Sequence, residues 1–128
     1  MIVLISPPGL KITSGFQMHS PNPPIGLAYV AGTLKDAGHA YTVIDATGEG
    51  IDRVSPYPGR DDILIKGLSF EEIVARIPKQ TTIVGVSCMF SSMWPMTKLL
   101  CEKIRAGFPE VLLVLGGEHG TAVPANVL

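Results

Sequence analysis

The 128-residue sequence contains two cysteines, Cys88 and Cys101, which are too few for a disulfide framework or a closed zinc site. Charged residues make up 16% of the chain and the formal net charge is −1, so no strong field of one sign favours nucleic acid or an anionic membrane as a partner. No apolar run approaches the length of a membrane span, and the apolar start, residues 1–6, has no basic flank of the kind that precedes a signal peptide core. These absences predict a soluble cytoplasmic protein.

Several nucleotide-binding motifs are also missing. The fingerprint Gly-x-Gly-x-x-Gly does not follow the first apolar run, and no Walker sequence occurs anywhere in the chain. The loop SPPGL at residues 6–10 is neither the Ser/Thr/Gly-rich phosphate loop of a flavodoxin nor the acidic loop of a response-regulator receiver. The sequence therefore gives no support to phosphate binding by these devices.

Short apolar runs alternate with helical patterns along the chain. Apolar residues make up 46% of the sequence, which is typical of one globular domain with a real core. Three of the runs, rich in Val, Ile and Leu, are typical of strands covered on both faces, and a fourth alternates as an edge strand does. The expected strands are residues 2–6, 40–46, 82–87 and 111–116, and the expected helices lie within residues 23–38, 69–78 and 91–109. Residues 47–68 show no clear period.

Local signals mark the ends of these helices. Ser69 and Glu72 have the spacing of a capping box at the start of the second helix. Ser91 or Ser92 is placed to cap the third helix, and Gly38 suits the C-terminal end of the first.

The alternation of strands and helices predicts a doubly wound α/β fold, flavodoxin-like or Rossmann-like, with a parallel sheet flanked by helices. In such sheets ligands bind beyond the carboxyl ends of the strands, where the strand order reverses. The loops to inspect therefore begin at Ser6, Asp45, Ser87 and Gly116. Because residues 121–128 look like the start of a helix that leads to no further strand, we expect the fold to be truncated before its last strand, as the N-terminal piece of a longer protein.

The stretch GGEHG, residues 116–120, ends the last expected strand with two glycines. Glycine is costly to order and offers no side chain to pack, so it marks either a sharp backbone turn or a place where space is needed. The residues alone leave both readings open.

Three segments together resemble a known family. They are PPIGLAYVAGTLKDAGHAYTVIDA (23–46), IVGVSCMFSS (83–92) and GGEHGTAVP (116–124). In this order they resemble the N-terminal cobalamin-binding domain of the cobalamin-dependent radical S-adenosylmethionine enzymes, and the likeness runs from about Ile2 to Pro124. The resemblance implies that residues 1–128 form a cobalamin-binding α/β domain, with a C-terminal radical S-adenosylmethionine domain beyond Leu128.

The resemblance also implies roles at matching positions. The Ser87 hydroxyl is expected to bond the dimethylbenzimidazole of cobalamin, and Gly116 and Gly117 are expected to leave room for that ring or its ribose and phosphate. Glu118 and His119 are expected at the rim, facing the corrin amides. The full set of expected cobalamin-binding residues is Pro7, Pro8, Gly9, Ser87, Cys88, Met89, Phe90, Gly116, Gly117, Glu118 and His119. No catalytic residue or metal ligand is assigned.

Two departures from related enzymes shape the expected function. The Asp-x-His-x-x-Gly motif, whose histidine binds cobalt from below in the cobalamin mutases, is absent, and the spacing of His19 in the first long loop assigns it no such role. A Cys-x-x-x-Cys-x-x-Cys run is also absent, so a [4Fe-4S] cluster and S-adenosylmethionine are expected in the parent chain, beyond this segment. By resemblance, the chain binds cobalamin for a methyltransferase or a related bond- or ring-forming enzyme and has no activity alone.

Two other functions remain as alternatives. The first is a cofactor-free docking domain of a radical S-adenosylmethionine protein, which keeps the fold and binds another domain through the same loops. The second is a small enzyme that uses a nucleotide or flavin, which the missing phosphate loop disfavours.

Overall fold

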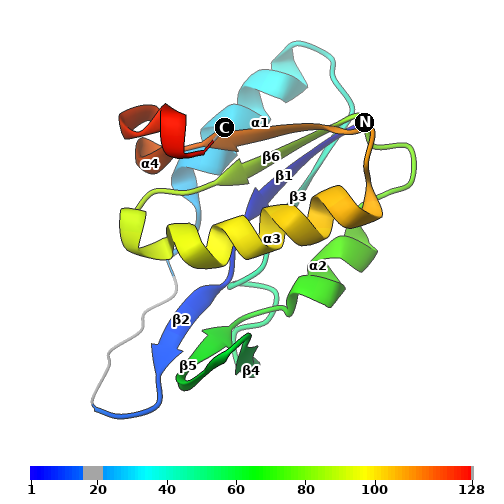
Figure 1. The fold of residues 1–128 in the computed structure, drawn as a ribbon. Coiled ribbons are helices and arrows are strands. Elements are labelled where there is room, and N and C mark those ends of the chain that lie inside the picture. The colour runs from blue at the N-terminus through cyan, green and yellow to red at the C-terminus, as the bar shows by residue number, and fades with distance from the viewer. Residues whose placement is uncertain (16–21, 128) are drawn as a thin grey trace.

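The computed structural model describes residues 1–15 and 22–127. Its centre is a parallel sheet of four strands in the order β3-β1-β6-β7, with α1 on one face and α2 and α3 on the other (Figure 1). The elements are β1 (Ile2–Ser6), α1 (Ile25–Asp36), β3 (Tyr41–Asp45), α2 (Phe70–Arg76), β6 (Ile83–Ser87), α3 (Trp94–Gly107) and β7 (Leu112–Gly116). The doubly wound fold predicted from the sequence is confirmed, and the alternating strand β3 lies at the sheet edge, as expected.

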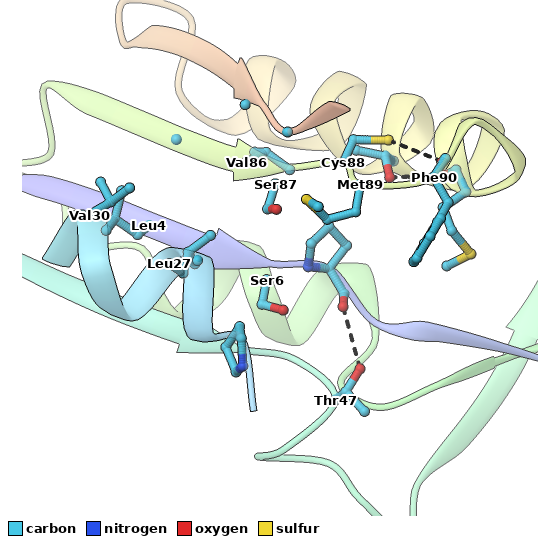
Figure 2. Close-up of a pocket in the computed structure, with 18 of the residues that line it drawn as sticks. Leu4, Ser6, Leu27, Val30, Thr47, Val86, Ser87, Cys88, Met89 and Phe90 are labelled. Atoms are coloured by element: carbon cyan, nitrogen blue, oxygen red, sulfur yellow. Dashed lines mark hydrogen bonds between the residues drawn. The ribbon is translucent and has the colours of Figure 1, made fainter. Parts of the chain in front are cut away.

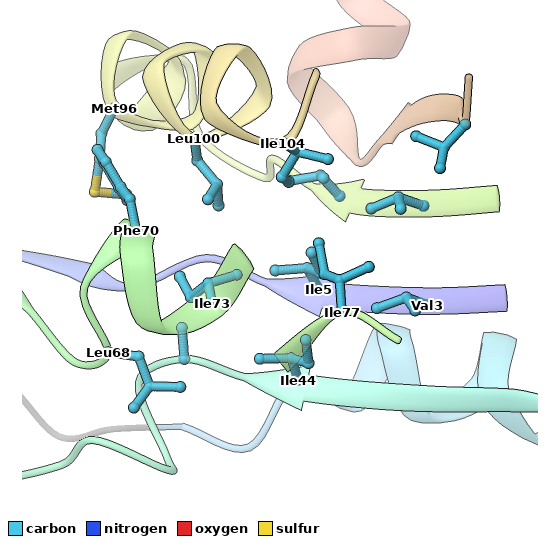
Figure 3. Close-up of a cluster of buried hydrophobic side chains, with 14 of the residues drawn as sticks. Val3, Ile5, Ile44, Leu68, Phe70, Ile73, Ile77, Met96, Leu100 and Ile104 are labelled. Carbon is cyan, nitrogen blue, oxygen red and sulfur yellow. The ribbon is translucent and has the colours of Figure 1, made fainter. Parts of the chain in front are cut away.

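The core fills the space between the sheet and the pair α2 and α3. Alternate strand residues such as Val3, Ile5 and Val84 point to this side and are fully buried. They pack against Ile73 of α2 and Leu100 of α3 (Figure 3). Because β-strand side chains alternate between faces, the residues between them point to the side of α1.

The strand order reverses between β1 and β6. The chain passes from β1 to its neighbour β3 on one side, whereas β6 leads to β7 on the other side. In a doubly wound sheet this arrangement opens a crevice between the carboxyl ends of the two central strands. The loops that follow β1 and β6 therefore border the place where a ligand is expected.

The helix ends agree with the sequence at α1 and α2 but not at α3. Ser69 forms the predicted capping box, because its Oγ accepts a hydrogen bond from the Glu72 N–H (3.2 Å) and its N–H donates to Glu72 Oε2 (2.9 Å). Gly38 ends α1 with a positive φ of 75°. The prediction that Ser91 or Ser92 caps α3 is wrong: the helix follows a 3₁₀ turn, η1 (Ser91–Met93), and neither η1 nor α3 has a side-chain cap bond.

A second, antiparallel sheet was not predicted. It has the order β2-β5-β4, with β2 (Gly9–Ile12), β4 (Val54–Tyr57) and β5 (Arg60–Lys66), and it projects beyond the carboxyl edge of the main sheet (Figure 1). The turn between β4 and β5 contains Pro58 and Gly59, a turn signal that the lack of periodicity obscured. β4 tolerates Pro56 because it is an edge strand of this sheet.

The face of the main sheet on the side of α1 is only partly covered. α1 packs over β1 and β3, while Leu112 and Val114 of β7 are 60% and 45% exposed. The expectation that β7 is covered on both faces is therefore wrong for the described residues. After β7 the chain forms the short helix α4 (Glu118–Ala122) and the 3₁₀ turn η2 (Pro124–Asn126). In the described part of the chain, no helix combines the length and apolarity that crossing a membrane requires.

Candidate functional site

Strand register aligns a row of small residues at the carboxyl edge of the sheet. Ser87 of β6 lies opposite Gly116 of β7, and Ser6 is the next residue after the pair formed by Ile5 and Val86. Ser6, Ser87 and Gly116 thus form one row across the three strands β1, β6 and β7, pointing to the side of α1. We call these three residues the edge row.

The row below the edge row forms a floor. Leu4, Gly85 and Val114 lie opposite one another on the same three strands. Gly85 has no side chain to fill the space above β6, although an added Cβ would lie 3.1 Å from Leu4 Cδ2. Glycine within a strand often marks a site where a ligand or another backbone comes close.

A cavity of about 780 Å³ stands over these two rows. One wall is α1, which contributes Leu27 and Val30, and the others are the loops that follow β1 and β6 (Figure 2). The walls are mainly apolar, and the lining also includes the hydroxyl-bearing residues Ser6, Ser87, Thr47 and Thr97. This volume, and an apolar lining with a few polar groups, are typical of pockets for organic ligands.

The structure brings together most of the residues predicted from the sequence. Those that line the cavity are Pro7, Pro8, Gly9, Ser87, Cys88, Met89, Phe90, Gly116 and Gly117. The Thr47 hydroxyl donates a hydrogen bond to the Pro7 carbonyl (3.4 Å), which joins the loop after β1 to the loop after β3 (Figure 2). Whether these residues bind a cofactor stays a prediction.

Glu118 and His119 do not belong to the cavity lining. Glu118 is exposed at the start of α4. His119 is not at the rim, because its side chain is buried, with Nδ1 3.0 Å from Ser91 Oγ and its ring centroid 5.1 Å from that of Trp94. The expected position of the His119 side chain is therefore corrected.

The two adjacent glycines have different surroundings. A Cβ added at Gly116 meets nothing closer than the Val86 carbonyl oxygen at 4.0 Å, so a side chain there would enter open space. A Cβ added at Gly117 would lie 2.5 Å from the Cys88 carbonyl oxygen, and Gly117 has a φ of 96°. Gly116 leaves space, and Gly117 permits a sharp turn against a neighbouring loop. The sequence left two interpretations open, and each holds for one residue: space is left at Gly116, and a sharp turn occurs at Gly117.

The loop after β6 presents both buried and exposed apolar groups. The Cys88 thiol is buried and lies 3.6 Å from the Phe90 carbonyl oxygen, and burial raises its pKa. The side chains of Met89 and Phe90 are 53% and 69% exposed at the cavity. Large exposed apolar groups beside a pocket favour contact with an apolar ligand surface.

The cavity lining also contains residues that are not in the expected cobalamin-binding set. They are Leu4, Ser6, Asn22, Pro23, Pro24, Ile25, Gly26, Leu27, Val30, Thr47, Gly85, Val86, Met93, Thr97 and Val114. Ser6 and Gly85 carry a signal that was available, since strand alternation places both on the face opposite the core residues Val3 and Ile5. The contribution of α1 depends on how the helix lies on the sheet, which spacing does not reveal. His19 lies outside the described residues.

The fold and cavity define the class of protein: a doubly wound α/β domain with a ligand pocket at its topological switch point. Residues 15–128 match the B12 binding domain family, and the chain belongs to this family. The chain is also 31% identical, over 107 residues, to cytidylyl-2-hydroxyethylphosphonate methyltransferase of Streptomyces wedmorensis. That match covers 82% of this chain and 20% of the relative, so the chain spans about a fifth of the relative's length. No solved structure matches the chain.

Family membership supports cobalamin as the cofactor, and the cavity fits part of it. The nucleotide tail of cobalamin is a flat aromatic ring joined to a ribose and a phosphate. The apolar lining suits the ring, and the open space beside Gly116 leaves room for it. The hydroxyls of Ser6 and Ser87 supply hydrogen-bonding groups at the edge row.

Proposed function

We propose that the cavity holds the nucleotide tail of cobalamin and that the domain presents the cofactor to a methyltransferase reaction. The observation that carries the proposal is the edge row, which places two hydroxyls and a glycine side by side at the switch point. Methyl transfer is supported by the name of the relative from Streptomyces wedmorensis.

The chain's own residues bind and orient the tail. The hydroxyl of Ser87 bonds the aromatic ring, and the hydroxyl of Ser6 reaches the same space from the neighbouring strand. Leu27 and Val30 of α1 close the apolar side, which excludes water from the ring. Met89 and Phe90 present apolar surface at the edge of the cavity, toward the corrin. Bound cobalamin supplies a cobalt centre through which a methyl group passes, and the protein supplies position.

We further propose that the parent protein is a radical S-adenosylmethionine enzyme with its [4Fe-4S] cluster outside this domain. The resemblance in the three sequence segments supports this proposal. Purification of the native polypeptide from its source cells, with iron and sulfide analysis, tests it. We expect about four iron and four sulfide per cobalamin, and a native protein that contains cobalamin but no iron would contradict it.

The variant Gly116→Leu tests the place of the tail. A leucine side chain at this position fills the open space without a backbone clash, so we expect the Kd for hydroxocobalamin to rise at least about tenfold, which corresponds to roughly 1.4 kcal/mol. The measurement is a visible absorption titration, with circular dichroism to check the fold.

A matched control is Gly32→Leu on α1. An added Cβ at Gly32 also meets nothing within 4 Å, and Gly32 does not line the cavity. We expect its affinity to equal that of the wild type. Unchanged affinity of Gly116→Leu for hydroxocobalamin would exclude this cavity as the tail site. If the wild type and both variants fail to bind hydroxocobalamin, the cofactor-free docking function is favoured instead.

A further inference from the structure

The loop after β6 touches the segment that follows β7, and Cys88 and Gly117, one from each, line the cavity. The Cys88 N–H donates to the Gly116 carbonyl (2.8 Å), and the His119 N–H donates to the Cys88 carbonyl (3.2 Å). Gly117 packs so closely on Cys88 that no side chain fits between them. These contacts fix the position of Cys88 relative to Gly116 and Gly117, and all three residues line the cavity.

The His119 side chain adds a third connection. Its Nδ1 lies 3.0 Å from Ser91 Oγ, and its ring lies against the indole of Trp94 with a centroid distance of 5.1 Å and an interplanar angle of 30°. Ser91 begins η1 and Trp94 begins α3, so this one side chain of α4 contacts the first residue of each. We call these contacts with Ser91 and Trp94 the His119 bridge.

The chemistry of the His119 bridge explains why a histidine stands here. An imidazole offers a flat ring for Trp94 and a nitrogen for Ser91, and a serine hydroxyl donates or accepts according to the tautomer. The Ser91 hydroxyl caps neither η1 nor α3, which leaves it for this contact. His119 Nε2 is buried and has no hydrogen-bond partner among the described residues, so the Ser91 contact is the polar interaction that orients the ring.

We propose that His119 is a positioning residue: the His119 bridge holds the two loops at the spacing at which Ser87, Cys88 and Gly116 accept the cofactor tail. This inference rests on the proposed function, and His119 itself does not touch the cofactor in this account. The His119 bridge acts through the loop backbone, because the His119 N–H donates to the Cys88 carbonyl. Cys88 directly follows Ser87, which is a member of the edge row.

Ser91→Ala is the sharpest test, because it removes one hydroxyl from an exposed residue and leaves the ring contact in place. The neighbouring Ser92→Ala is the matched control, since Ser92 is also exposed and its hydroxyl has no hydrogen-bond partner among the described residues. Ser91→Thr keeps a hydroxyl at this position and serves as the conservative variant. The probes are amide hydrogen exchange of the cofactor-free protein and titration with hydroxocobalamin.

In Ser91→Ala we expect the Cys88 and His119 amides to exchange about 3- to 10-fold faster and the Kd for hydroxocobalamin to rise by a similar factor, as for the loss of one hydrogen bond. Ser92→Ala and Ser91→Thr should match the wild type in both measurements. A role in overall stability alone would raise exchange across the whole sheet and leave the Kd of the folded protein unchanged.

The outcomes separate the two proposals. If the wild type binds hydroxocobalamin and Ser91→Ala keeps both its amide protection and its affinity, the positioning role is overturned and the proposed function stands. If the wild type binds no cobalamin, the proposed function fails, while the exchange measurement still decides whether the His119 bridge holds the loops. His119→Phe, which keeps a ring against Trp94 but loses the bond to Ser91, should behave like Ser91→Ala; wild-type behaviour would contradict the proposal.

Discussion

At the scale of single residues, Gly117 forms a sharp turn that requires glycine, whereas the preceding Gly116 does not. Its φ of 96° disfavours any residue with a Cβ, and an added Cβ would overlap the Cys88 backbone. We expect Gly117→Ala to lower the free energy of unfolding by about 1–3 kcal/mol, the range for strained backbone positions. Urea unfolding checks this, and a Gly117→Ala protein as stable as the wild type would show that the loops separate at little cost.

The Cys101 thiol gives a prediction about pH. Burial, with smaller effects of Cys88 and Glu102, raises its pKa from an ordinary 9.0 to about 11. Because the unfolded chain loses the proton first, the contribution of Cys101 to stability is fully present below about pH 9 and is lost as the pH rises toward 11. We expect the wild type to lose stability relative to Cys101→Val over this interval.

Urea unfolding of the wild type and Cys101→Val at several pH values between 8 and 11 measures this difference. Other groups titrate in the same range, but they are shared by the two proteins and cancel in the comparison. Stability curves that stay parallel across the interval would show that the folded environment does not disfavour the Cys101 thiolate.

At the scale of the elements, the capping box of α2 has a measurable contribution. Ser69 satisfies the Glu72 N–H, and Glu72 satisfies the Ser69 N–H in return. We expect Ser69→Ala to cost about 1 kcal/mol of stability, the usual value for an N-cap, and to lower the Tm by roughly 3–6 °C. Calorimetry checks this. Glu72→Gln keeps an oxygen that accepts from the Ser69 N–H, so it should cost less stability than Ser69→Ala. An equal loss in Glu72→Gln would show that the ion pair between Glu72 and Arg53 contributes as much as the Ser69 cap.

Much of the element pattern follows from the sequence, because three of the four main strands are continuous apolar runs, the fourth alternates as an edge strand does, and the helices carry clear periodicity. The small sheet does not, since its edge strands have only four residues each and one of them contains Pro56. The site was predicted in part. Residues at the carboxyl ends of the expected strands, such as Ser87 and Gly116, can be located from the sequence because the ends of those strands can. The burial of His119 depends on a partner 28 residues away, Ser91, and no local pattern encodes such a contact.

At the scale of the whole molecule, the cavity joins parts that are far apart in the chain. Its floor comes from β1, β6 and β7, its wall from α1, and its edge from the loops after β1 and β6. The three antiparallel strands of the second sheet stand beyond the same edge of the main sheet (Figure 1). The exposed apolar groups of Met89 and Phe90 lie at this edge as well, so the ligand side of the domain combines an apolar slot with an exposed apolar border.

Whether the cavity holds the nucleotide tail is decided by comparing hydroxocobalamin with cobinamide, which keeps the corrin but lacks the tail. Both are titrated into the wild-type protein and followed by visible absorption. Since burial of the tail contributes most of the contact surface in this account, we expect cobinamide to bind at least about 100-fold more weakly, roughly 2.8 kcal/mol. Equal affinity for the two corrinoids would contradict the account, because the slot beside Gly116 would then contribute nothing to binding.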